Sequence, residues 1–175
     1  ENFLASTLSA ADVALETSGT ANGTVTVSGS GTSLTVTISG ITGNGTLGIS
    51  IAPGTATDQS GNLAAGAGPS ASFPVDDTAP TVTISAPSST LTKGGPVSYT
   101  VSYSDANFQS STLSAGDITL NKTGTANGTV NVSGTGAMRT VAITGITGDG
   151  TLGISLAAGT ATDKAGNSAG AAGPS

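Results

Sequence analysis

The chain repeats itself at a spacing of 105 residues without a gap. Residues 1–70 align with residues 106–175, and 46 of these 70 pairs are identical. The segment GTANGTV at 19–25, for example, recurs at 124–130. This period exceeds the roughly 20–50 residues of a solenoid repeat and fits a small domain. We therefore expect a stretch of a longer array of domains, with both chain ends inside a repeat and any leader peptide out of view.

The composition excludes several classes of function. Only 8% of the residues are charged, and the net charge is −6. The four basic residues are not clustered, which argues against a nucleic acid partner because such a partner requires a basic face. No run of 18 apolar residues occurs, so we expect no membrane insertion in this segment.

Catalysis finds no support in the residue types present. The chain contains no His and no Cys, so neither a Ser–His nor a Cys–His arrangement can form. The glycines fall in turns and none precedes a helix as in a phosphate-binding loop. We therefore predict that the chain is not an enzyme.

Alternation of apolar with Thr or Ser residues predicts an all-β fold. Val97-Ser98-Tyr99-Thr100-Val101 shows this period of two, which places the apolar side chains on one face of a strand. One complete repeat contains seven such strands, separated by Gly, Asn, Asp and Pro turns, and this spacing is typical of a two-sheet Greek-key sandwich. We expect the strands at 81–85, 96–103, 117–122, 128–133, 138–144, 150–157 and, from the first repeat, 71–75. The segment 107–117 lacks alternation and predicts a helical turn or a loop.

Two partial domains follow from this assignment. Residues 1–75 lack the first two strands of the repeat, and residues 76–175 lack the last one. The missing strands belong to neighbouring repeats of the same chain or are donated by an adjacent chain to an open sheet edge. The alternation further predicts a core of Val82, Ile84, Tyr99, Val101, Ile118, Leu120, Val130, Val132, Val141, Ile143, Leu152 and Ile154.

Three segments resemble the bacterial immunoglobulin-like repeats of large surface proteins and adhesins. They are Val75–Ile84 with its Asp-Asp-Thr-Ala-Pro run, Asp105–Phe108, and Gly159–Asn167 with Asp-x-x-Gly-Asn. The resemblance implies tandem immunoglobulin-like sandwiches in an extracellular stalk on the bacterial cell surface. It also implies that some members bind calcium at domain junctions. The chain lacks the Cys pair and core Trp of antibody-type domains, which does not argue against the bacterial class.

Acidic residues gather at one pole of the predicted sandwich, where the linker and two loops meet. The predicted ligands are Asp76, Asp77, Asp105, Asp163 and Asn167, and oxygen donors of this kind suit Ca²⁺. The first repeat keeps Asp58 and Asn62 but has Glu1 in place of Ala106, so we expect an incomplete site there. Asp and Asn before Gly are also common turn residues, which leaves a purely structural interpretation open. By the same reasoning, Asp12 and Asp117 are predicted to be caps.

The sequence is compatible with three functions. The first is a structural spacer or stalk repeat of a surface protein, with calcium stiffening the junctions. The second is a binding module for carbohydrate, ice or a host protein; its terminal ligand is unknown, and the scarcity of aromatic residues counts against sugar stacking. The third is a filament or decoration subunit assembled by β-strand complementation.

Overall fold

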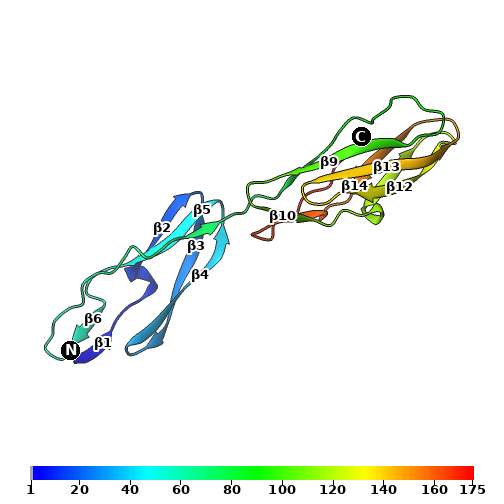
Figure 1. The fold of residues 1–175 in the computed structure, drawn as a ribbon. Coiled ribbons are helices and arrows are strands. Elements are labelled where there is room, and N and C mark those ends of the chain that lie inside the picture. The colour runs from blue at the N-terminus through cyan, green and yellow to red at the C-terminus, as the bar shows by residue number, and fades with distance from the viewer. Residues whose placement is uncertain (1) are drawn as a thin grey trace. The chain divides into compact units, whose positions relative to one another are not determined.

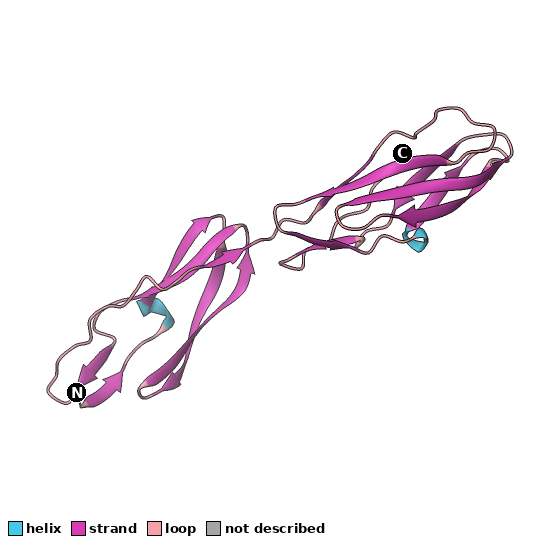
Figure 2. Ribbon diagram, viewed as in Figure 1, coloured by secondary structure: helices cyan, strands magenta, loops and turns pink. Residues whose placement is uncertain are grey.

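The regular secondary structure is almost entirely antiparallel β-strand, in a β-sandwich-like arrangement. The computed structural model describes residues 2–175 and divides into two compact units, Glu1–Asp77 and Thr78–Ser175 (Figure 1). The predicted boundary after Val75 lies two residues before this division. Two single-turn 3-10 helices are present (Figure 2), and no helix of residues 2–175 is long and apolar enough to cross a membrane. The prediction of an all-β fold is confirmed.

Residues 2–77 of the first unit form seven strands in three antiparallel groups, ordered β1-β6, β2-β5-β7 and β3-β4. The strands are β1 (Phe3–Ser6), β2 (Val13–Gly19), β3 (Asn22–Ser30), β4 (Ser33–Thr42), β5 (Gly45–Ile51), β6 (Ala56–Asp58) and β7 (Phe73–Val75).

The second unit contains eight strands, ordered β10-β15, β11-β14 and β12-β13-β9-β8. They are β8 (Thr81–Ile84), β9 (Val97–Ser104), β10 (Phe108–Ser111), β11 (Ile118–Lys122), β12 (Asn127–Ser133), β13 (Met138–Thr147), β14 (Leu152–Leu156) and β15 (Ala161–Asp163). Strands β10 to β15 are the copies of β1 to β6, whereas β7, β8 and β9 each occur once.

Alternation and register together build the core of the second unit. Val141 of β13 lies opposite Tyr99 of β9 on one side and Val132 of β12 on the other, so apolar side chains meet across three strands. Tyr99 and Val141 are buried in one cluster with Ile154. All twelve predicted core residues belong to this cluster or pack against it, which confirms the assignment of the inward face.

The segment 107–117 is more ordered than the sequence predicted. It contains β10, which pairs with β15, and then the single turn η2 (Ala115–Asp117). Asp117 accepts hydrogen bonds from the backbone N–H and the hydroxyl of Ser114, at 2.8 and 2.7 Å. Asp12 does the same with Ser9 at η1 (Ala10–Asp12), so the prediction that both acids are caps is confirmed.

Corresponding strands have different neighbours in the two units. Strand β13 lies between β12 and β9, whereas within residues 2–175 its copy β4 pairs with β3 alone. Ile143 of β13 is 1% exposed, but its counterpart Ile38 of β4 is only half-buried. The reverse holds where β7 pairs with β5, because Leu47 is fully buried while its counterpart Leu152 is not. Burial in each unit therefore depends on which strands cover it.

Matched substitutions at Ile143 and Ile38 test this dependence. Ile143→Ala leaves a cavity in a covered core, and we expect it to lower the free energy of unfolding by about 2–5 kcal/mol. Ile38→Ala removes a half-exposed side chain, and we expect a loss of about 1 kcal/mol.

Each unit can be followed separately in urea. The two tyrosines of the chain, Tyr99 and Tyr103, lie in the second unit and no tryptophan is present, so tyrosine fluorescence reports that unit. Amide exchange in β4 reports the first unit. Equal losses at the two positions would show that the stability contributed by this isoleucine does not depend on the neighbouring strands.

Candidate metal centre

The first part of the candidate metal centre is the loop Asp163–Asn167, which begins at the last residue of β15 and is closed by hydrogen bonds to its own aspartate. The Asp163 carboxylate accepts hydrogen bonds at Oδ1 from the backbone N–H groups of Gly166 (2.7 Å) and Asn167 (2.8 Å). Its Oδ2 accepts a third bond from the Asn167 side-chain amide, at 2.8 Å. Gly166 has a φ of +97°, a conformation that disfavours side chains, so the glycine of Asp-x-x-Gly-Asn is needed for the turn. The loop thus holds its own acid in one orientation.

Two opposing effects determine the pKa of Asp163. Burial of its side chain, which is 0% exposed, would raise the pKa by disfavouring the charged form. The hydrogen bonds from Asn167 and from the backbone N–H groups of the loop stabilise that form, and together they hold the pKa below the ordinary 3.8. The loop therefore presents a buried carboxylate that stays ionised at neutral pH.

Asp105 is brought to the same place by the pairing of β10 with β15. It follows β9, and its Oδ1 accepts a 2.6 Å hydrogen bond from the Asn107 N–H, which tightens the turn into β10. Phe108 lies opposite Asp163 in the strand register, and the Lys164 N–H donates to the Asn107 carbonyl at 2.9 Å. These backbone bonds fix the two acidic loops side by side.

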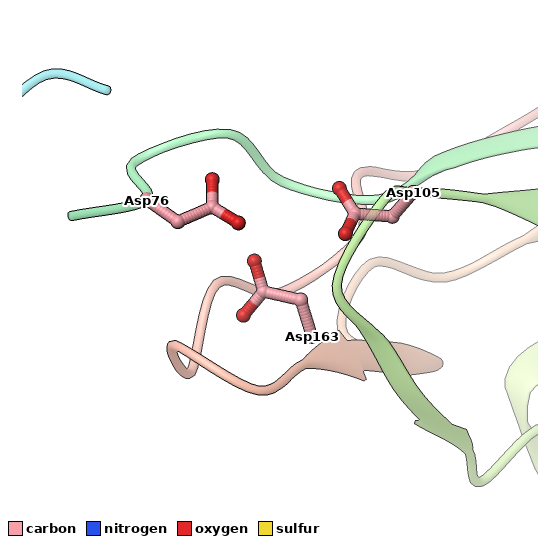
Figure 3. Close-up of side chains that lie close together, drawn as sticks. All are labelled: Asp76, Asp105 and Asp163. Carbon is pink, nitrogen blue, oxygen red and sulfur yellow. The ribbon is translucent and has the colours of Figure 1, made fainter. Parts of the chain in front are cut away.

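The third acid is Asp76, which follows β7 and precedes the first residue of the second unit by two positions. One carboxylate oxygen from each of Asp76, Asp105 and Asp163 lies within 4.8 Å of the others (Figure 3). Asp76 and Asp105 are partly buried and Asp163 is buried. Three negative charges at this separation repel one another, and a bound cation would relieve the repulsion.

The donors suit a hard cation that accepts oxygen ligands. Ca²⁺ takes six to eight oxygens in flexible geometry, whereas Mg²⁺ requires a near-ideal octahedron. Because Oδ1 of Asp163 already accepts two N–H groups, Oδ2 is the oxygen of that residue best able to bind a cation. Three carboxylates alone do not complete the shell, so backbone carbonyls or water would supply the remaining ligands.

The other two predicted ligands of this pole, Asn167 and Asp77, form hydrogen bonds of their own. Asn167 uses its side-chain amide to hold Asp163. The Asp77 carboxylate accepts a 3.3 Å hydrogen bond from the Gly43 N–H, and the Asp77 N–H donates to Oδ1 of Asn44, so Asp77 braces the β4–β5 turn of the first unit. The sequence predicted the shared pole but not which of two adjacent aspartates would face it.

The first unit repeats the loop without the cluster. Asp58 accepts hydrogen bonds from the N–H groups of Ser60 and Asn62 and from the Asn62 side-chain amide, at 2.8 to 2.9 Å. No acidic trio includes Asp58 among residues 2–175, and Glu1 lies outside the described residues. The loop motif is therefore a structural device in both units, to which the second unit adds further acids.

Removal of the Asn167 amide should sensitise the second unit to acid. The pKa of Asp163 is lower in the folded than in the unfolded state, so its stabilising effect is present above the unfolded value and is lost as pH falls through the folded value. Without the Asn167 hydrogen bond, burial is opposed less strongly and the folded pKa rises. We expect Asn167→Ala to shift the acid-unfolding midpoint to higher pH and to lower the melting temperature by about 5 °C.

Asn62→Ala is the matched control for this experiment. It removes the same bond from the first unit, so the tyrosine signal of the second unit should keep its acid midpoint. An unchanged midpoint in Asn167→Ala would show that the loop does not stabilise the ionised form of Asp163.

Three kinds of comparison address the relationship of this chain to known proteins. No protein-family model, no curated protein and no solved structure matches it.

Proposed function

We propose that the chain is a structural spacer segment of a bacterial extracellular adhesin or surface protein, built from immunoglobulin-like repeats. The observation that carries the proposal is the repetition of one compact β unit at 46 of 70 identical positions. Duplication of a unit adds length to a protein without adding a new type of site. The segments that resemble bacterial surface repeats support an extracellular, cell-surface location.

The strand orders support the immunoglobulin-like assignment. Constant-type immunoglobulin domains place strands A, B, E and D in one sheet and C, F and G in the other. If β8 and β9 are strands A and B of the repeat, the order β8-β9-β13-β12 corresponds to A-B-E-D. In the first unit, β2-β5-β7 corresponds to C-F-G. The A-B-E-D order is thus complete in the second unit, and the C-F-G order is complete in the first.

The surface chemistry is compatible with a spacer. Exposed positions of the hairpins β3–β4 and β12–β13 carry mainly Thr, Ser and Asn, and few charges occur anywhere in the chain. Such a surface has little with which to attract partners electrostatically. Neighbouring repeats are accordingly the partners that the proposal requires.

Calcium has a definite role in this proposal. Asp105 and Asp163 belong to loops that are hydrogen-bonded to one another, whereas Asp76 belongs to the segment that enters the second unit. A cation held by all three residues would neutralise the cluster and restrict this segment. The stalk would then lose part of its freedom to bend at the linker.

Thermal unfolding of the full chain with Ca²⁺ and with chelator tests the metal centre. We expect the melting temperature of the second unit to rise by about 10 °C when Ca²⁺ is a hundredfold above its Kd. Asp105→Asn should remove most of this rise. Asp149→Asn, at an exposed turn outside the cluster, is the control and should retain it. A melting temperature that is independent of Ca²⁺ would reduce the cluster to turn chemistry.

Spin labels test the mechanical role. The chain has no cysteine, so Thr35→Cys and Thr140→Cys introduce one exposed label in each unit. We expect Ca²⁺ to narrow the distribution of distances between the labels. An unchanged distribution, with Ca²⁺ demonstrably bound, would contradict stiffening and leave a flexible spacer.

A further inference from the structure

The first unit has a half-buried apolar face, whereas the corresponding face of the second unit is covered. Between the strands of this unit lies a groove of about 220 Å³. It is lined by Val36, Ile38, Gly48, Ile49, Ser70, Ala71 and Phe73. Val36, Ile38 and Ile49 are half-buried, whereas their counterparts Val141, Ile143 and Ile154 are at most 1% exposed.

Strands β8 and β9 account for this difference. Strand β9 pairs with β13 from Met138↔Ser102 to Ile143↔Val97, and β8 pairs with the other edge of β9. The corresponding edge of β4, from Ser33 to Ile38, receives no strand among residues 2–175. An unpaired edge beside an apolar face is a template for a further strand.

We propose that the open face of the first unit is a docking site for a strand pair from a further repeat, with the sequence type of residues 78–105. The occupant would pair with β4 in the register that β9 uses on β13. A Tyr99-type residue would then lie opposite Val36, and a Val97-type residue opposite Ile38. The inference rests on the repeat architecture of the proposed function but not on calcium.

Tyr103 makes two side-chain contacts in the second unit, and the residues that it contacts have identical counterparts in the first unit. The Tyr103 hydroxyl donates to Oγ1 of Thr160 at 2.8 Å, and the Tyr103 ring stacks on Phe108 with centroids 6.2 Å apart. The counterparts of Thr160 and Phe108 are Thr55 and Phe3, both only partly buried. A tyrosine from the docked strand would find the same hydroxyl and the same ring.

A second copy of this chain is a poorer occupant. Each chain carries one β8–β9 pair, and β13 of the same chain already uses it. Its donation to another chain would expose Val141 and Ile143, so no burial would be gained. A further repeat that carries an unused strand pair has no such cost.

The test uses the isotopically labelled full chain in chelator with an unlabelled synthetic peptide of residues 78–105. We expect chemical-shift changes along β4. The backbone N–H groups of β4 that point away from β3, called its outward amides, should exchange about tenfold more slowly when the concentration of free peptide is ten times its Kd. A peptide in which Tyr99, Val101 and Tyr103 are replaced by Ser keeps the length but loses the apolar face, and should not bind. The chelator separates this outcome from any failure of the calcium proposal.

Substitutions in the chain locate the binding face. Val36→Asp places a charge in the groove and should abolish the effect of the peptide. Thr35→Asp, on the outer face of the same strand, is the matched control and should bind normally, because its counterpart Thr140 stays exposed when the face is covered.

A tethered variant guards against failure of the peptide to remain soluble. It places a copy of residues 78–105 directly before Glu1, because Asp105 precedes Ala106, the counterpart of Glu1, in the second unit. We expect slowed exchange in β4 here as well. Exchange of the peptide into β13, self-association of the unmodified chain through β4, or unprotected β4 amides in the tethered variant would each overturn the proposal.

Discussion

The burial of each apolar strand face in this protein depends on the strands that lie alongside it and opposite it. Short Thr-rich strands have a single apolar stripe each, so their stability comes from strands that lie opposite and alongside. The two copies of the repeat show this dependence: Ile143 is buried where β9 pairs alongside β13, whereas Ile38 is only half-buried because β4 has no such neighbour among residues 2–175. Sequence sets the inward face of each strand, and the neighbouring strands determine whether that face is buried.

Much of the fold could be predicted from alternation alone. Alternation predicts the strands around Val82, Tyr99, Val130, Val141 and Ile154 to within a few residues, because each strand shows several apolar residues at a period of two. The pairing of β10 with β15 was missed. Each of these strands is three or four residues long, and their register shifts near Phe108, so no pattern long enough to recognise exists.

The candidate centre shows the same limit on a smaller scale. Topology predicted that the linker and two loops would share one pole, and Asp76, Asp105 and Asp163 do lie together. The choice between Asp76 and Asp77 could not be predicted, because adjacent residues of an extended linker point in opposite directions and the register of β7 decides which one faces the pole. The role of Asn167 as a hydrogen-bond donor to Asp163, in addition to any role as a ligand, required the loop geometry.

We infer that one repeat sequence is fully stable only where neighbouring strands cover it. Native-state hydrogen exchange of the unmodified full chain tests it most directly, by comparing outward amides of β4 between Ser33 and Ile38 with their counterparts between Met138 and Ile143. We expect slow exchange in β13, and exchange in β4 that approaches the rate of an unprotected chain. Equal protection of the two strands would contradict it.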